Sequence, residues 1–190
     1  MYGQAMSPER LDRESWIVAG LDALEAGGVD AVAAASLAKA LDVTRGSFYW
    51  HFSSRDELLE AVLERWERDH SDAVLARLEA IADPRARLKM LSEAASSKPP
   101  SLFLRLLEAA GREPAVAATL ARSRERRTTF LAKAYREAGL TPAAARRRAL
   151  VAYAAYVGLA QLLGTEPDLL SDRERAAFTR ELHAALTGSI

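Results

Sequence analysis

The sequence of 190 residues contains no cysteine, which excludes disulfide bonds, cysteinyl zinc sites and thiol catalysis. It also lacks net charge, because 26 basic residues balance 26 acidic ones, so bulk electrostatics offers no case for nucleic-acid binding. No apolar run approaches the ~18 residues of a membrane helix, and the first residues lack the charged start and apolar stretch of a signal peptide. These absences predict a cytoplasmic protein without a membrane partner.

Proline and glycine are scarce as well, with 7 and 10 residues, and they fall between segments of helical periodicity. Alanine is abundant, and no strand-like alternation of apolar and polar residues extends beyond a few positions. This pattern predicts an all-α fold of about nine helices. The chain is long enough to bury a sizeable core, either as one large domain or as two small ones.

Capping residues and helix breakers set the predicted helix boundaries. Ser7 is the expected cap of the first helix, which begins near Pro8 or Arg10. Ser54 and Glu57 have the spacing of a capping box at the start of a long helix. The predicted helices cover residues 8–26, 32–41, 44–50, 54–82, 84–97, 101–110, 114–138, 142–163 and 172–186.

The second and third of these helices are short and are joined by Asp42 and Val43. Two short helices across such a turn are typical of a helix-turn-helix motif. Two amphipathic helices in an ordinary bundle would explain the turn. They would not explain residues 44–52, where three polar side chains precede an unbroken run of aromatic and imidazole groups. A short helix with a polar N-terminus suits the major groove of DNA.

The residue types at this N-terminus suggest specific DNA contacts. Arg45 has the bidentate donors that recognise guanine O6 and N7. Thr44 and the free backbone N–H groups beside it are suited to a phosphate. Tyr49, His51 and Arg55 are donors for phosphate oxygens.

Four blocks in this region resemble the DNA-binding domain of the tetracycline-repressor-like (TetR) family of bacterial transcriptional regulators. They are Leu37-Ala38-Lys39-Ala40-Leu41, Val43-Thr44-Arg45-Gly46-Ser47, Phe48-Tyr49-Trp50-His51-Phe52 and Arg55-Asp56-Glu57-Leu58-Leu59. The resemblance covers roughly residues 10–60. It implies an N-terminal three-helix DNA-binding domain, residues 1–54, and a larger helical domain, residues 55–190, that binds a small molecule and dimerises.

The resemblance also implies roles for individual residues. Thr44, Arg45 and Ser47 would face DNA at the start of the recognition helix. The DNA backbone would be contacted by Tyr49, His51 and Arg55. Phe48 and Phe52 would belong to the core, and Trp50 would either touch the DNA backbone or pack inside the domain.

Two departures from the family pattern shift these expectations. Asp42 stands in the turn, where the family often has glycine, and aspartate is one of the few other residues that tolerate a left-handed backbone. Residues 33–35 are all alanine, where the family often has polar or basic side chains, so Arg45 and Ser47 would carry more of the base recognition.

The charge of the predicted DNA-binding domain is uneven. Residues 1–54 contain four bases against seven acids, whereas residues 31–55 contain three bases and one acid. The local excess of positive charge predicts modest non-specific affinity, with specificity from Arg45 and from a two-fold dimer.

The last two predicted helices are candidates for the dimer interface. The helix over 142–163 is apolar around most of its circumference and must be buried. The resemblance implies that both helices pack against their symmetry mates as a four-helix bundle. The expected interface residues are Tyr153, Val157, Gln161, Phe178, Leu182 and Leu186.

An effector pocket is expected among the helices between residues 84 and 135, although for each lining candidate on its own we favour an ordinary core position. Because these side chains are mostly apolar, they favour a hydrophobic effector. Two basic runs, residues 122–127 and 146–148, could bind an anionic ligand or DNA, but we favour solvated helix faces and ion pairs for them. The candidate lining residues are Met90, Phe103, Leu106, Leu107, Phe130 and Tyr135.

Enzyme motifs for phosphate, dinucleotide, zinc-protease or serine-hydrolase chemistry are missing, and the three histidines lack metal-ligand spacing. We therefore expect no enzymatic activity, no cofactor and no metal. The leading hypothesis is a homodimeric repressor that binds a palindromic operator in double-stranded DNA and is released by a small-molecule effector. The alternative is a helical binding module or small enzyme whose N-terminal domain has lost DNA affinity.

Overall fold

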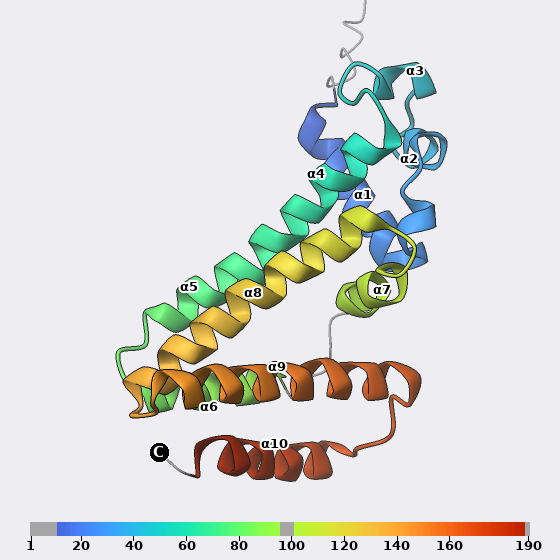
Figure 1. Cartoon of the computed structure of the whole chain (residues 1–190). Coiled ribbons are helices and arrows are strands. Elements are labelled where there is room, and N and C mark those ends of the chain that lie inside the picture. Colours follow the sequence, from blue (N-terminus) through green and yellow to red (C-terminus); the bar gives the residue numbers. More distant parts are fainter. Residues whose placement is uncertain (1–10, 96–100, 189–190) are drawn as a thin grey trace, which may run out of the picture. The chain divides into compact units, whose positions relative to one another are not determined.

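The computed structural model describes residues 11–95 and 101–188, which are helical with short connections and contain no β-strand (Figure 1). The expected all-α fold is confirmed. The chain divides after Arg65 into two compact units, here called unit 1 and unit 2. The α-helices are α1 (Arg13–Gly27), α2 (Ala34–Ala40), α3 (Arg45–Phe48), α4 (Arg55–Glu67), α5 (Ala73–Glu79), α6 (Pro84–Ala95), α7 (Ser101–Ala109), α8 (Pro114–Glu137), α9 (Pro142–Thr165) and α10 (Asp172–Thr187).

Unit 1 is built around an aromatic core. The rings of Trp16 and Phe48 meet edge to face with their centroids 5.4 Å apart, and Phe48 stacks on Phe52 at 5.6 Å. All three side chains are buried. Since α3 is only four residues long, Phe48 and its aromatic neighbours anchor it to the rest of the unit. Aliphatic residues of the neighbouring helices complete the core: Ile17, Leu24, Leu37, Leu58, Leu59 and Val62.

Helix α1 begins later than the sequence pattern predicted. Its N-cap is Asp12, whose Oδ1 accepts the backbone N–H of Ser15 at 2.8 Å and the Ser15 hydroxyl at 2.7 Å. These hydrogen bonds lower the pKa of the Asp12 carboxyl. A start at Pro8 or Arg10 is therefore wrong, because residues 11 and 12 are not helical. The predicted cap Ser7 lies outside the described residues.

The predicted long helix over residues 54–82 is interrupted. Helix α4 passes into a π-helical segment, Arg68–Asp72, before α5 continues to Glu79. The Ser54 hydroxyl accepts the backbone N–H of Glu57 at 3.1 Å, as expected of a cap. The Glu57 carboxylate, however, accepts the backbone N–H of Ser53 at 2.7 Å. Single-turn π segments are rare and occur frequently at functional sites.

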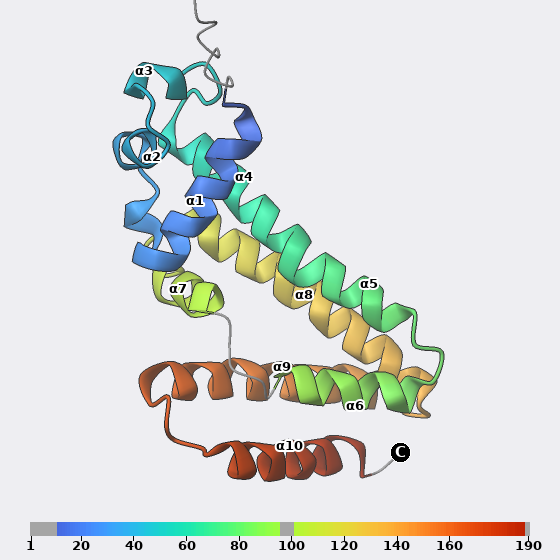
Figure 2. The ribbon, with the colours of Figure 1, turned by 180° about the vertical axis from the view of Figure 1, so that it is seen from behind.

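Helix α8 is the central element of unit 2 and packs along α9 and α6. Helix α10 lies alongside α6 and α9 in both views (Figures 1 and 2). The small residues Ala134, Ala145 and Ala149 are buried where α8 and α9 meet, which lets the two backbones approach closely. The helix starts predicted at residues 84, 101, 114 and 142 all agree with the structure.

None of the helices among the described residues combines the length and the apolar character needed to cross a membrane.

Candidate nucleic-acid interface and ligand cavity

Helices α2 and α3 are joined by a tight turn at Asp42. The backbone N–H of Val43 donates to the carbonyl of Ala38 at 2.9 Å, and that of Asp42 donates to Lys39 at 3.3 Å. This pair of bonds is the Schellman pattern, which requires a left-handed residue after the helix. Asp42 supplies it with a φ of 53°. The connection has the short, sharp form of a helix-turn-helix.

The N-terminus of α3 presents a polar and aromatic surface. Phe48 turns inward and is 1% exposed, whereas Tyr49 is 56% and Trp50 82% exposed. Thr44 and Arg45 are also exposed at the start of the helix. A tryptophan side chain as exposed as Trp50 is unusual on a surface without a binding partner. It adjoins the hydrogen-bond donors that the sequence predicted for DNA.

Side chains at this surface are organised by hydrogen bonds. The hydroxyls of Thr44 and Ser47 lie 3.2 Å apart, and the Arg45 guanidinium donates through Nη2 to the Tyr49 hydroxyl at 3.4 Å. Ser47 and His51 are half-buried beside them. Most of the Arg45 donors remain available to an external acceptor.

Arg55 is engaged within unit 1. Its Nε donates to the carbonyl oxygen of Val32 at 3.0 Å, and its Nη2 donates to Val29 at 2.9 Å. These bonds tie the start of α4 to the segment that leads into α2. The sequence predicted a phosphate donor here; the structure also gives this residue a positioning role.

The basic residues of unit 1 fall into two classes. Arg13 pairs with Glu57, and Arg65 pairs with Glu14. Within residues 11–95 and 101–188, Lys39 and Arg45 have no carboxylate partner, and both are exposed. Among the described residues of unit 1, the bases without a carboxylate partner therefore lie on the helix-turn-helix, where the sequence has its local excess of positive charge.

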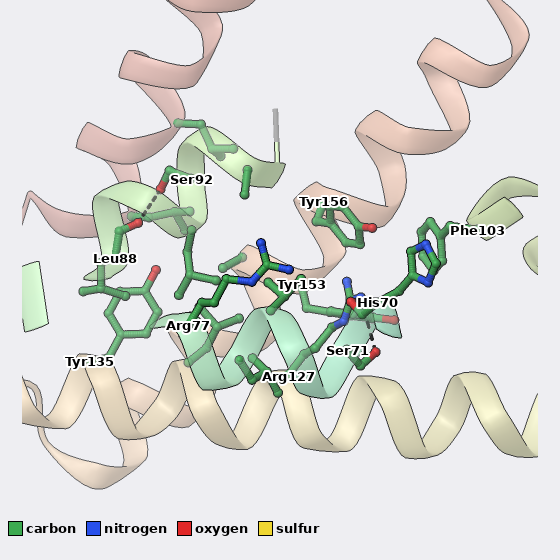
Figure 3. Close-up of a pocket in the computed structure, with 18 of the residues that line it drawn as sticks. His70, Ser71, Arg77, Leu88, Ser92, Phe103, Arg127, Tyr135, Tyr153 and Tyr156 are labelled. Carbon is green, nitrogen blue, oxygen red and sulfur yellow. Dashed lines mark hydrogen bonds between the residues drawn. The ribbon is translucent and has the colours of Figure 1, made fainter. Parts of the chain in front are cut away.

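Unit 2 encloses a cavity of about 430 Å³ (Figure 3). One wall is aromatic: Trp66 stacks on Phe103 with centroids 6.5 Å apart, and Phe103 stacks on Tyr156 at 5.2 Å. The opposite wall is aliphatic and is formed by Leu88, Leu131, Leu182 and Leu186. A cavity of this volume with an apolar lining and a few polar groups is typical of small-molecule sites.

The polar groups of the cavity converge from the π-helical segment and α8. The Arg127 guanidinium donates through Nη2 to the carbonyl of His70 at 3.1 Å, and it lies 5.4 Å above the ring centroid of Tyr156. The hydroxyls of Ser71 and Ser123 are 2.9 Å apart and buried. The π-helical segment thus brings the His70 carbonyl within reach of Arg127.

Two tyrosines of the cavity remain protonated at neutral pH. Tyr135 is 2% exposed, and burial raises the pKa of its hydroxyl to about 12. Burial also raises the pKa of Tyr153, against the opposing effect of the Arg127 charge. Both hydroxyls can therefore donate hydrogen bonds.

Comparison with known proteins bears first on unit 1. The family model described as bacterial regulatory proteins, tetR family, matches residues 17–62, which contain the helix-turn-helix. Over these residues the chain is similar to the tetR family. A tetracycline repressor protein of class G from Vibrio anguillarum is 37% identical over 60 residues, which are 32% of this chain. The match spans only 29% of that repressor's length.

Solved structures extend the likeness of fold to nearly the whole chain. A transcriptional regulator from Rhodococcus sp. Rha1 superposes with a TM-score of 0.76 and 22% identity, covering 94% of this chain and 97% of the other. A tetR-family transcriptional regulator from Cytophaga hutchinsonii gives a TM-score of 0.74 and 16% identity, with 93% of each chain covered. At these identities the likeness establishes the fold of unit 2 and leaves its ligand open.

Two of the six predicted pocket residues, Phe103 and Tyr135, line the cavity of unit 2. The other four, Leu106, Leu107, Phe130 and Met90, do not. Met90 is 49% exposed because α6 turns Leu88, Leu91 and Ser92 toward the cavity instead. Phe130 packs beneath Arg87, whose guanidinium lies 5.9 Å from its ring.

Three of the residues predicted for the dimer interface also belong to the cavity: Tyr153, Leu182 and Leu186. Val157 and Phe178 are half-buried, and Gln161 is exposed. The expected interface residues do not include the large exposed apolar residues of α9, which are Leu150, Val151 and Leu162. The signal was available, since these residues break the small-residue pattern of that helix.

Arg77 and Arg127 line the cavity but are not among the predicted pocket residues. Arg127 belongs to a basic run for which ion pairing was favoured. Arg122 and Arg126 of that run do pair, with Glu67. Helical spacing could have distinguished Arg127 from the paired arginines, because positions 122 and 126 share a helix face and position 127 lies about 100° away from 126.

Proposed function

We propose that the chain is a ligand-responsive transcriptional regulator that binds a palindromic operator in double-stranded DNA as a homodimer. It acts as a repressor, and a small-molecule effector bound in the cavity of unit 2 releases it. The observation that carries the proposal is the exposed N-terminus of α3, where Arg45 has no carboxylate partner among the described residues. The tetR-family match over this segment supports the same conclusion.

The proposed DNA contacts follow from exposure and chemistry. Arg45 would donate in bidentate fashion to a guanine edge, and Ser47 would assist with a neighbouring base. Thr44 and the first N–H groups of α3 would hold a phosphate together with the Tyr49 hydroxyl. Trp50 and His51 would pack against the sugar-phosphate backbone. Arg55 would hold the domain together at the start of α4 and would contact a phosphate from that position.

The proposed dimer uses α9 and α10. Leu150, Val151 and Leu162 expose apolar surface on α9, and a second copy of this helix is a suitable cover. A two-fold dimer would place two copies of α3 in successive major grooves, about 34–36 Å apart. This symmetry is the reason for a palindromic operator.

Release by an effector is proposed to act through the helix that leads out of unit 1. Helix α4 continues into the π-helical segment, and that segment lines the cavity with Asp69, His70 and Ser71. A ligand that favours one arrangement of this segment changes the population of DNA-binding dimers. The ligand and the operator then oppose each other's binding.

Selection of bound sequences from random double-stranded DNA tests the proposal. We expect enrichment of a palindrome and a loss of at least about tenfold in affinity with Arg45→Ala. Arg124→Ala, an exposed charge on α8, is the matched control and should leave operator affinity unchanged. The log–log dependence on salt should be shallower than about −10. No enrichment at low salt would overturn the proposal and favour a helical module without DNA affinity.

A further inference from the structure

We propose that the cavity of unit 2 binds an anionic amphiphile, a monocarboxylate with an apolar body, whose carboxylate contacts Arg127. The inference deepens the proposed function, since it rests on the cavity being the effector site, and it replaces a merely hydrophobic effector with a charged one. Arg127 is the residue that recognises the charge, Arg77 adds a second guanidinium, and the leucine wall holds the apolar body.

Arg127 differs from the other arginines of its run. Arg122 contacts Glu67 at 3.3 Å, and Arg126 contacts Asp72 at 2.7 Å. Arg127 has no carboxylate partner among the described residues, although it is half-buried. A guanidinium withdrawn from water without an anion is poorly compensated, so a carboxylate beside it would be strongly favoured.

The donors of Arg127 are only partly used. Its Nη2 reaches the His70 carbonyl at 3.1 Å and the Ser71 hydroxyl at 3.4 Å. Its Nε and Nη1 have no acceptor within the described part of the chain. The planar guanidinium fork matches a carboxylate with two parallel hydrogen bonds. Each of the two idle nitrogens can donate a hydrogen bond to an oxygen of a ligand carboxylate.

Charge in the lining favours an anion more generally. Arg77 on α5 forms no ion pair or hydrogen bond with the described residues, and Figure 3 shows its guanidinium reaching in among the lining side chains. Asp69 is the one carboxylate among the described lining residues, so guanidinium groups outnumber carboxylates. Low-dielectric walls strengthen the resulting positive potential.

Two uncharged hydrogen-bond donors of the cavity also lack an acceptor among the described residues. Trp66 is buried, and its Nε1 has no hydrogen-bond partner within the described residues. The Tyr135 hydroxyl likewise forms no hydrogen bond there. A ligand rich in acceptor oxygens would satisfy these donors, whereas a ligand that carries only donors would leave them unpaired.

A cationic ligand is disfavoured by the same geometry. Aromatic walls often bind quaternary ammonium groups through their ring faces. Here the Arg127 guanidinium already lies 5.4 Å over the Tyr156 ring. A second cation at this wall would meet a like charge. The aromatic wall therefore supports Arg127 in place and provides a flat surface for the apolar body of the ligand.

Three ligands of one chain length test the charge preference: octanoate, octan-1-ol and octyltrimethylammonium. Binding to the full chain is measured by isothermal titration calorimetry. We expect octanoate to bind at least about tenfold more tightly than octan-1-ol, because a charged hydrogen bond is worth about 1.5–3 kcal/mol. The ammonium compound should bind more weakly than both. Equal affinity for the acid and the alcohol, or no binding of any of the three, would overturn the proposal.

Variants assign the preference to a residue. Arg127→Gln should abolish the advantage of octanoate over octan-1-ol and leave octan-1-ol binding unchanged. Arg127→Lys, which keeps the charge without the planar fork, should retain part of it. Arg124→Gln, an exposed arginine on the same helix, is the matched control and should keep the full preference. Circular dichroism establishes that each variant is folded, and an unchanged preference in folded Arg127→Gln would overturn the assignment.

Operator binding is measured separately, so that the two proposals fail differently. A chain that binds its operator but prefers octan-1-ol overturns the anion site alone. A chain that prefers octanoate through Arg127 but binds no DNA overturns the regulator and leaves the anion site standing. Octanoate that binds through Arg127 and weakens operator binding supports both.

Discussion

The two units of this chain differ in how their interiors are packed and in where the side chains proposed to act are placed. Unit 1 closes its core around Trp16, Phe48 and Phe52, and the side chains proposed to act lie outside that core on one short segment. Unit 2 leaves about 430 Å³ open, and the side chains proposed to act point inward from helices that are distant in the sequence. A surface that contacts a large partner can be formed by one short segment of the sequence, whereas a cavity for a small molecule needs side chains from several separate helices.

The same contrast appears in how the charges are arranged. In unit 1, Arg13 and Arg65 are paired with glutamates, whereas Lys39 and Arg45 are exposed and have no carboxylate partner among the described residues. In unit 2, Arg122 pairs with Glu67 and Arg126 pairs with Asp72, whereas Arg127 lines the cavity and has no carboxylate partner among the described residues. A zero net charge thus conceals two separate positive sites.

The largest predicted effect tests how much the packing of Phe48 in the core of unit 1 contributes to stability. Phe48→Ala removes the ring between Trp16 and Phe52 and should lower the free energy of unfolding by about 3–5 kcal/mol. Trp50→Ala, two residues away and 82% exposed, should change it by less than about 0.5 kcal/mol. Urea denaturation followed by circular dichroism measures both. Similar losses for the two variants would contradict the inward and outward assignment.

A second prediction compares glycine-to-alanine changes in the two units. The added Cβ at Gly20 would lie 2.6 Å from Cγ2 of buried Val62, and at Gly164 it would lie 2.8 Å from Cδ1 of Leu104. Val62 is stiff at χ1, whereas the end of a half-buried leucine can rotate away. Gly20→Ala should therefore destabilise by about 1–2 kcal/mol, although alanine favours helix by about 1 kcal/mol.

In the second unit, Gly164→Ala should be neutral or stabilising by up to about 1 kcal/mol. Thermal denaturation of the two variants gives the comparison. Val62→Ala in the Gly20→Ala background should cost less than in the wild type, because it relieves the clash. Additive effects at these two sites would contradict the contact.

The sequence predicted most of the fold because its boundaries are marked by local chemistry. Pro84, Ser101, Pro114 and Pro142 each occupy the first position of a helix, and this preference needs no knowledge of packing. The surface of α3 was predicted for a related reason, since its residues are contiguous. The start of α1 at Arg13 was missed because Ser7 offered an equally good cap by sequence.

The cavity could not be predicted in the same way. Periodicity identifies apolar side chains but not the place where neighbouring helices fail to fill the space between them. Met90 and Leu88 are both apolar and two positions apart, yet only Leu88 faces the cavity. The π-helical segment shifts the register of its helix by one residue, and no residue type in Arg68–Asp72 indicates this shift.

A third prediction concerns the buried hydroxyl of Tyr135. Its pKa is raised from the ordinary value near 10 to about 12, so between these values the unfolded chain loses a proton that the native state keeps. Stability should therefore fall as the pH rises from about 10 to 12, by about 1–2 kcal/mol in total. Tyr135→Phe keeps the ring and should remove this part of the slope. Urea denaturation from about pH 9 to 11.5 tests it, and identical slopes would refute the assignment.

The smallest predicted effect uses a motif that occurs once in each unit. Helix α8 ends as α2 does, since Leu140 donates to the Tyr135 carbonyl and Gly139 donates to Arg136, both at 3.0 Å. The left-handed position is Gly139 here, with a φ of 114°, and Asp42 in unit 1, with a φ of 53°.

Asp42→Gly should raise the free energy of unfolding by about 0.5 kcal/mol. The substitution relieves backbone strain in the native state, and the greater entropy of glycine in the unfolded chain offsets part of this gain. Gly139→Asp should lower it by about 1 kcal/mol, since 114° lies well outside the left-handed region that aspartate tolerates. Differential scanning calorimetry measures both, and changes of the same sign would show that the two turns are not equivalent.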